Sequence, residues 1–128
     1  MVLMKVNNIS IYEAGKHDSD IFLEVRNNEE ARLNSLNTIP IYIDEHEKWF
    51  RKCLDSSTDY LLVAKIKSNY IGVCRFNKIE DIYWISYAIL DEFRGKGYAK
   101  ILIKESLLRF SLFKPTSHIV YARIKKDN

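Results

Sequence analysis

The chain of 128 residues has little of what marks secreted, membrane-spanning or nucleic-acid-binding proteins. Its two cysteines, Cys53 and Cys74, are too few for a disulfide framework, which favours a reducing, cytoplasmic location. No apolar run approaches the roughly 20 residues of a membrane span, and residues 1–5 lack a signal peptide's apolar segment. The net charge of +3 suits a small anionic ligand but is too weak to argue for nucleic acid. We therefore expect one domain over residues 1–128, with no membrane or nucleic-acid partner.

Motifs for metals and nucleotide hydrolysis are also missing. The three histidines, His17, His46 and His118, are far apart and lack paired cysteine or aspartate spacings, so no metal site is expected. No lysine followed by serine or threonine comes after the glycines at 95 and 97, which disfavours a P-loop NTPase. Cys74 is interpreted as a small core residue rather than an acyl carrier. Any catalytic or binding chemistry must therefore come from motifs other than these.

Hydrophobic periodicity predicts strands mixed with a few helices. Asp18 is expected to cap one helix, and Asp44-x-x-Glu47 resembles a capping box that opens another. The expected elements are a first strand in residues 2–6 or 9–12, a helix over 18–25, a short helix and loop over 26–40, a helix over 44–54, strands over 60–66, 70–76 and 82–90, a helix over 96–110, and a strand over 117–124.

The predicted helix over residues 96–110 is amphipathic. The side chains expected toward the sheet are Ala99, Leu102, Ile103, Ser106, Leu107 and Phe110. Those expected toward water are Lys100, Lys104, Glu105 and Arg109.

Residues 84–99 are the most informative stretch. The first seven carry no charge, which is typical of a strand buried on both faces. Gly95 and Gly97 permit a tight turn that leaves backbone N–H groups uncovered where the next helix begins. Those groups and the positive helix end favour phosphate, and Arg94 and Lys96 add cationic side chains. The pattern predicts a phosphate cradle, the alternative being a turn that needs glycine only for its geometry.

Arg94-x-x-Gly97-x-Ala99 resembles the R/Q-x-x-G-x-G/A acetyl-CoA signature of the GNAT family of N-acetyltransferases. The resemblance implies an α/β (α+β) fold in which helices flank a mixed, mostly antiparallel central sheet, with a parallel, splayed strand pair at the cofactor site. It also implies acetyl-CoA as cofactor, its pyrophosphate on the loop and its pantetheine arm along the preceding strand. The cofactor-binding residues implied are Ile89, Leu90, Arg94, Gly95, Lys96, Gly97, Tyr98, Ala99 and Asn128.

The resemblance specifies the proton-transfer groups less well. Many relatives carry a glutamate base at the position of Trp84, and an indole cannot accept a proton. A backbone N–H of Tyr87 or Ile89 is expected to polarise the thioester oxygen. The proton-transfer candidates are Asp81 and Glu80 acting through water, the hydroxyls of Tyr87 and Ser86, and the imidazole of His46.

Relatives also often use a tyrosine on a helix beyond the last strand predicted here. Residues 125–128 resemble the family's K-x-N entry to that helix. We therefore expect a domain truncated at its C-terminus, whose uncovered sheet edge favours self-association, for example as a homodimer.

The N-terminal half resembles acetyltransferases of amino-sugar biosynthesis, most of all the UDP-4-amino-sugar N-acetyltransferases of the pseudaminic acid pathway. The resemblance rests on Arg26-Asn27, Asn34-Ser35-x-Asn37 and Glu45-His46-x-x-Trp49-Phe50. It implies that the acceptor is bound by Arg26, Asn27, Asn37, His46 and Trp49. An arginine can bind a phosphate through two N–H donors, and a tryptophan offers a stacking face. The alternative is that these side chains are part of the core.

Two functions remain open at this point. One is an N-acetyltransferase acting on a small amine, such as a nucleotide-linked amino sugar, or on a protein N-terminus such as that of a ribosomal protein. The other is a non-catalytic acyl-CoA-binding module, which Trp84 at the usual acid position would suit.

Overall fold

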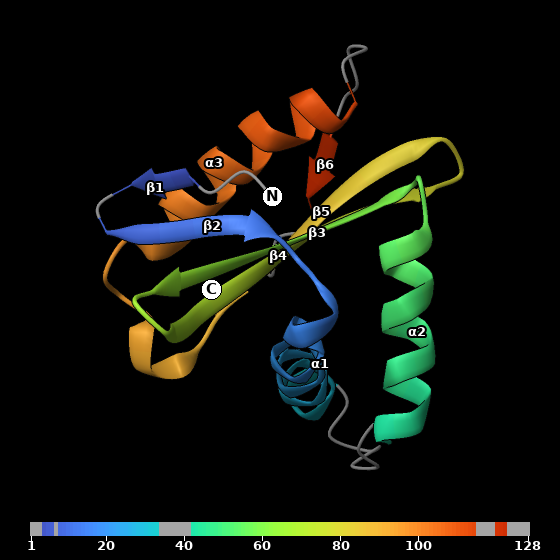
Figure 1. The fold of residues 1–128 in the computed structure, drawn as a ribbon, viewed down its shortest axis with the longest axis horizontal. Helices are drawn as coiled ribbons and strands as arrows, with labels where there is room; N and C mark the ends of the chain where they lie inside the picture. Colours follow the sequence, from blue (N-terminus) through green and yellow to red (C-terminus); the bar gives the residue numbers. More distant parts are fainter. Residues whose placement is uncertain (1–3, 7, 34–41, 115–119, 123–128) are drawn as a thin grey trace.

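The computed structural model describes residues 4–6, 8–33, 42–114 and 120–122. They form a six-stranded sheet in the order β1-β2-β3-β4-β5-β6 (Figure 1). Neighbouring strands are antiparallel except for β5 and β6, which are parallel. The elements are β1 (Met4–Val6), β2 (Ile9–Glu13), the 3-10 turn η1 (Lys16–Asp18), α1 (Ser19–Leu33), α2 (Ile43–Asp55), β3 (Asp59–Ile66), β4 (Asn69–Ile79), β5 (Ile82–Ile89), the 3-10 turn η2 (Asp91–Phe93), α3 (Tyr98–Phe113) and β6 (Val120–Ala122). The expected mixed, mostly antiparallel sheet with a parallel pair is confirmed.

Helices cover both faces of the sheet, and a separate core fills each side. Figure 1 shows α3 on one face and the pair α1 and α2 on the other. The core under α3 contains Leu102 and Phe110 against the inward residues of β2 to β5. The core under α1 and α2 contains Phe22 and Phe50 against the opposite residues of the same strands. Central strands buried on both sides explain the near-continuous apolar run Tyr60–Ala64, whose members are at most 7% exposed.

Aromatic stacking holds α3 to the sheet. Phe110 stacks on Phe76 with ring centroids 4.3 Å apart, and Phe113 stacks on Tyr60 at the same separation. Such pairs add about 1 kcal/mol each beyond the area that they bury. Because β5 leads through η2 into α3, these contacts also hold the glycine loop against the end of β5.

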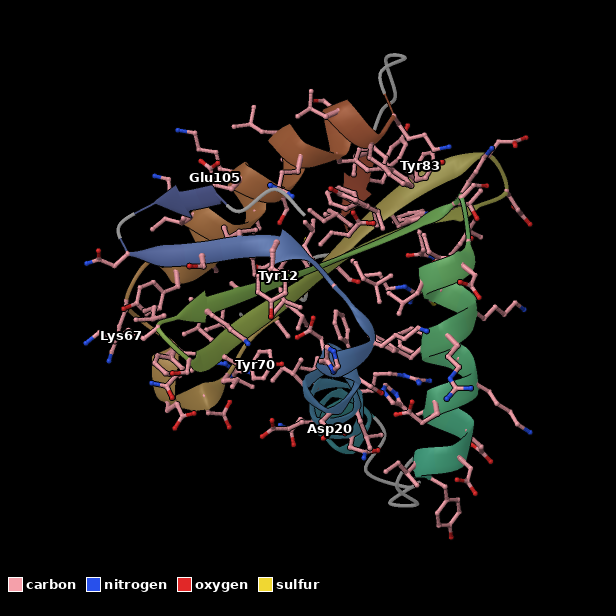
Figure 2. All side chains as sticks on the ribbon, viewed as in Figure 1. Tyr12, Asp20, Lys67, Tyr70, Tyr83 and Glu105 are labelled. Atoms are coloured by element: carbon pink, nitrogen blue, oxygen red, sulfur yellow. The ribbon has the colours of Figure 1, made fainter. Side chains whose placement is uncertain are left out.

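Asp18 connects the sheet to the start of α1. Its carboxylate is 5% exposed and accepts hydrogen bonds from the hydroxyls of Tyr12 (2.9 Å) and Tyr70 (2.7 Å) and from the Gly15 N–H (2.9 Å). Figure 2 shows Tyr12 and Tyr70 on the side of the sheet that α1 covers. Burial and the bond to Asp18 raise the pKa of Tyr70 to about 12. Asp18 directly precedes Ser19, the first residue of α1, which is the N-cap position that the sequence predicts for it. The hydrogen bonds described for its carboxylate join Gly15, Tyr12 and Tyr70 rather than the first turn of that helix.

The N-terminal third differs from the sequence prediction in three respects. Both extended segments form strands, β1 and β2, where only one was expected. The helix α1 runs without a break to Leu33, where a helix ending near residue 25 and then a short helix and a loop were expected. The polar, asparagine-rich composition after residue 25 favoured that interpretation, but a helix that is anchored by packing can continue through such residues. The helix α2 forms as expected, but Tyr42 is its N-cap and makes no side-chain capping bond. Asp44 lies in its first turn, where its charge complements the helix dipole.

Two predictions about burial are also wrong. In β5, Ser86 and Tyr87 are exposed, so this strand is not buried on both faces. In α3, Glu105 and Arg109 are buried while Leu107 is 39% exposed, the reverse of the amphipathic expectation. The sheet lies under a broader stripe of α3 than the apolar spacing alone indicated. Lys100 and Lys104 are exposed as predicted.

Candidate active site

The loop between β5 and α3 has the geometry of an anion cradle. Gly95 and Gly97 have φ values of +77° and +83°, and Gly97 is the N-cap of α3 without a side-chain capping bond. A Cβ added to either glycine would meet nothing within 4 Å, so it would project into open space in front of the loop. The N–H groups of the first helical turn, which includes Tyr98 and Ala99, lack intrahelical partners. This arrangement fits the pyrophosphate of acetyl-CoA.

The cationic side chains of the loop have local partners. Arg94 donates its Nε–H to the Ile89 carbonyl at 3.1 Å and pairs with Asp91 at 3.2 Å. Lys96 is exposed, with its Nζ 6.0 Å from the centre of the Phe93 ring. Arg94 thus fastens the loop to the end of β5, and Lys96 is the more accessible charge for an incoming phosphate.

The backbone N–H and C=O groups of β5 point alternately toward β4 and away from it. The Leu90 N–H donates to the Ile71 carbonyl of the neighbouring chain segment at 2.9 Å, so it is committed on the β4 side. Since backbone groups alternate along an antiparallel strand, those of Tyr87 and Ile89 point away from β4, toward the side on which β6 lies. The described pairing with β6 covers only Tyr83 to Ile85. The N–H groups of Tyr87 and Ile89 therefore suit contacts with a pantetheine arm and a thioester oxygen. The Leu90 N–H is engaged by Ile71, and the Ile89 carbonyl by Arg94.

Two of the proton-transfer candidates lie at opposite ends of β5. The Tyr87 side chain is 46% exposed and lies on the α3 face of the sheet, since Tyr87 pairs with Cys74, a residue of the core under α3. Asp81 lies in the turn before β5, pairs with Lys78 at 3.6 Å and is 96% exposed. Six residues of extended strand separate the two by about 20 Å. The structure therefore does not bring Asp81 to the loop.

His46 lies in the core of the α1–α2 side. It is fully buried, and its ring nitrogens contact the Ser19 carbonyl (Nε2, 2.8 Å) and Arg26 Nη1 (Nδ1, 3.1 Å). A carbonyl can only accept and a guanidinium can only donate, so His46 is neutral with its proton on Nε2. Burial lowers its pKa, which agrees with that assignment. With both nitrogens engaged, His46 positions Arg26 and offers no site for the amine's proton.

The remaining acceptor candidates partly converge. Arg26 and Trp49 are half-buried and in contact, the guanidinium carbon lying 4.0 Å from the indole centroid. Asn27 follows on α1 and is half-buried. Asn37 and Asn128 lie outside the described residues.

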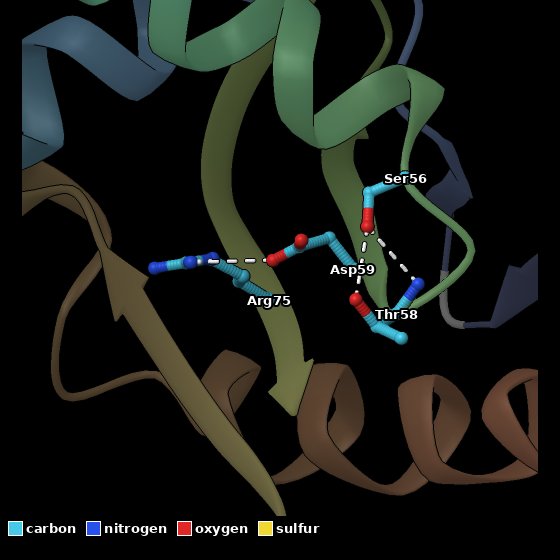
Figure 3. Close-up of polar contacts among 4 residues, drawn as sticks. All are labelled: Ser56, Thr58, Asp59 and Arg75. Carbon is cyan, nitrogen blue, oxygen red and sulfur yellow. Dashed lines mark hydrogen bonds and ion pairs between the residues drawn. The ribbon is translucent and has the colours of Figure 1, made fainter. Parts of the chain in front are cut away.

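Sequence reasoning missed Arg75. This β4 residue pairs with Asp59 of β3 at 3.2 Å, beside the Ser56–Thr58 hydrogen bond at the end of α2 (Figure 3). Its guanidinium carbon lies 5.1 Å from the Trp49 centroid. The available signal was a single charge inside the apolar hairpin strand 70–76.

The comparisons identify the class of protein. Residues 19–128 match the model of the acetyltransferase (GNAT) family, so the chain belongs to this family. It is therefore an acyltransferase that uses acetyl-CoA, and the non-catalytic module is set aside. A comparison with curated proteins found no match.

Solved structures share the fold at low sequence identity. They include yncA from Salmonella typhimurium, solved with its cofactor acetyl-CoA (18% identity, TM-score 0.75, covering 95% of this chain and 73% of that chain). An N-acetyltransferase from Staphylococcus aureus Mu50 shares 21% identity (TM-score 0.78, 95% and 76% covered). The dodecameric spermidine N-acetyltransferase from Vibrio cholerae shares 19% (TM-score 0.73, 95% and 72% covered).

Two other kinds of site are not found in the described part of the chain. No group of three or more histidine, cysteine, aspartate or glutamate side chains there could hold a metal ion. No described helix is long and apolar enough to cross a membrane.

Proposed function

We propose that this acetyltransferase acts on the amine of a small acceptor, and that the acceptor is a nucleotide-linked amino sugar. The observation that carries the proposal is the juxtaposition of Arg26, Trp49 and Arg75 on the α1–α2 side of the sheet. Guanidinium groups and an indole face suit a sugar phosphate and a base. Structural neighbours include an acetyltransferase solved with a CoA–acetylneamine bisubstrate analogue and a spermidine acetyltransferase, whose acceptors serve as comparison substrates.

The residues of β5 and the loop have distinct roles in this proposal. The loop N–H groups from Gly95 to Ala99 hold the pyrophosphate. The N–H of Tyr87 or Ile89 holds the thioester oxygen in place. Acetyl-CoA supplies the acetyl group: the amine nitrogen forms the amide bond, the carbon–sulfur bond breaks, and the amine proton is lost to solvent. Tyr87, an exposed residue of β5, donates a proton to the departing sulfur.

The test is thiol release from acetyl-CoA in the presence of UDP-linked amino sugars, spermidine, neamine and an N-terminal ribosomal-protein peptide. Sugar-dependent release supports the proposal, and preferential release with another acceptor overturns the amino-sugar assignment. Tyr87→Phe should lower kcat by at least tenfold while leaving the acetyl-CoA dissociation constant unchanged, because only the hydroxyl is lost. An unchanged kcat would remove Tyr87 from the mechanism. Self-association remains a separate prediction, which light scattering can test.

A further inference from the structure

Two arginines from different elements contact the ring of one tryptophan on the α1–α2 side. Arg26 of α1 lies 4.0 Å and Arg75 of β4 lies 5.1 Å from the centroid of the Trp49 ring. We call Arg26, Trp49 and Arg75 the arginine–tryptophan surface. Two cations around one ring repel each other, and a bound anion offsets part of that repulsion.

Both guanidinium groups are held by other side chains. Arg26 donates a hydrogen bond to Nδ1 of His46, and Nε2 of His46 donates one to the Ser19 carbonyl. Arg75 pairs with Asp59 through Nη2. Side chains held this way lose little freedom when a ligand binds, which favours affinity.

Arg75 retains unused donors. Its Nε is buried and has no hydrogen-bond partner among the described residues, and its ion pair to Asp59 engages only Nη2, so that Nη1 is the donor available to a ligand. Its side chain is 31% exposed. A phosphate can therefore add to Arg75 without displacing Asp59.

The arginine–tryptophan surface includes Arg75 of β4, and β4 is the strand next to β5, whose backbone is expected to contact the cofactor. Arg75 is opposite Ser86 in the β4–β5 register, and Ser86 is exposed next to Tyr87. Directly opposed residues of antiparallel strands lie about 5 Å apart. An acceptor whose phosphate contacts Arg75 can thus present an amine near β5.

We propose that Arg75, together with Arg26, binds a phosphate group of the acceptor, so that this enzyme acetylates phosphate-bearing amines and discriminates against polycations. The proposal rests on the proposed function, an acetyltransferase of a small amine, and specifies the chemical group by which the enzyme recognises its acceptor. It adds Arg75 as a specificity-determining residue. A competing explanation is that the surface only fastens α2 to the sheet, and the experiment separates the two.

Paired amines with and without phosphate test the specificity. Acetylation of glucosamine 1-phosphate is compared with that of glucosamine, and O-phosphoethanolamine with ethanolamine, with spermidine as the polycation. We expect kcat/KM to favour the phosphate-bearing member at least tenfold. Arg75→Gln should remove this preference by lowering kcat/KM for the phosphate-bearing amine alone. Arg51→Gln, which changes an exposed arginine on α2, is the matched control and should retain the preference.

A binding measurement that needs no turnover accompanies the kinetics. UDP is titrated calorimetrically into protein saturated with CoA, so that the cofactor loop is already occupied. Arg75→Gln should weaken UDP binding at least tenfold, with an unchanged melting temperature, and Arg75→Lys should restore part of it. Absence of UDP binding by the wild-type protein, equal binding by Arg75→Gln, or preference for spermidine overturns the proposal. If the acetyltransferase function itself is wrong, the result is different: no amine releases thiol from acetyl-CoA.

Discussion

Gly72 is the position at which a single methyl group should disturb the candidate site most. It pairs with Ile89 in the β4–β5 register. A Cβ there would lie 2.5 Å from the Ala88 carbonyl oxygen and 2.8 Å from Cδ1 of Ile89. The first contact is nearly 1 Å short of ordinary van der Waals distance and is made to backbone, which cannot rotate away. We therefore expect Gly72→Ala to push β4 and β5 apart.

The magnitude follows from the cost of overpacking, about 2 kcal/mol when backbone must shift. For a domain of this size that corresponds to a fall in Tm of roughly 6–10 °C. Because Ile89 moves with its strand, the acetyl-CoA dissociation constant should also rise.

Thermal unfolding followed by circular dichroism measures the effect. Gly15→Ala is the matched control: φ there is −116°, and the nearest atom to an added Cβ is 4.0 Å away. It should be neutral or slightly stabilising, by about 0.5 kcal/mol. If the two variants melt within 2 °C of each other, the close approach of β4 and β5 does not require glycine and the reasoning is refuted.

Three other expectations concern the loop, the buried histidine and the tyrosine–aspartate cluster. Gly97→Val should weaken acetyl-CoA binding at least tenfold, about 1.4 kcal/mol, since its side chain would occupy the space in front of the cradle, as calorimetry can show. Because burial lowers the pKa of His46 below 6.5, the unfolded chain binds a proton that the fold excludes. The free energy of unfolding should therefore fall as the pH drops below about 6.5, and less steeply in His46→Gln, by urea titration. Tyr70→Phe should cost about 2 kcal/mol by removing a hydrogen bond to the Asp18 carboxylate, measured by the same titration.

For each of these three predictions, one result would contradict the reasoning. Unchanged calorimetric affinity in Gly97→Val would remove the loop from the cofactor site. An equal loss of pH dependence in His17→Gln, which alters an exposed histidine, would show that His46 is not the group responsible. Wild-type stability in Tyr70→Phe would mean that the Asp18 carboxylate does not depend on that hydroxyl.

The candidate site could be predicted from the sequence where it depends on local geometry. The spacing of Gly95 and Gly97 between a strand and a helix is a property of a few consecutive residues, and the structure shows both with positive φ at the start of α3. The Asp44 cap illustrates how local reasoning also fails. Its spacing suits a capping box, but the helix begins one residue earlier, at Ile43, with Tyr42 as its N-cap.

The acceptor side could not be predicted in the same way, because it is assembled from distant segments. His46 has the chemistry of a proton acceptor, yet its burial against the Ser19 carbonyl and Arg26 engages both of its nitrogens. Arg75 carries no motif, and it reaches Trp49 only because β4 pairs with β3, the strand against which α2 packs.

The sequence by itself determined the family, the alternation of strands and helices, and the glycine loop, since periodicity and backbone freedom act over a few residues. Only the tertiary structure decided that Tyr87 and Ile89 direct their backbone groups away from β4, and that Arg26 and Arg75 share one indole. Strand register settles the first, and the docking of α1 and α2 settles the second. Both depend on contacts between residues far apart in the chain, which spacing along the chain does not encode.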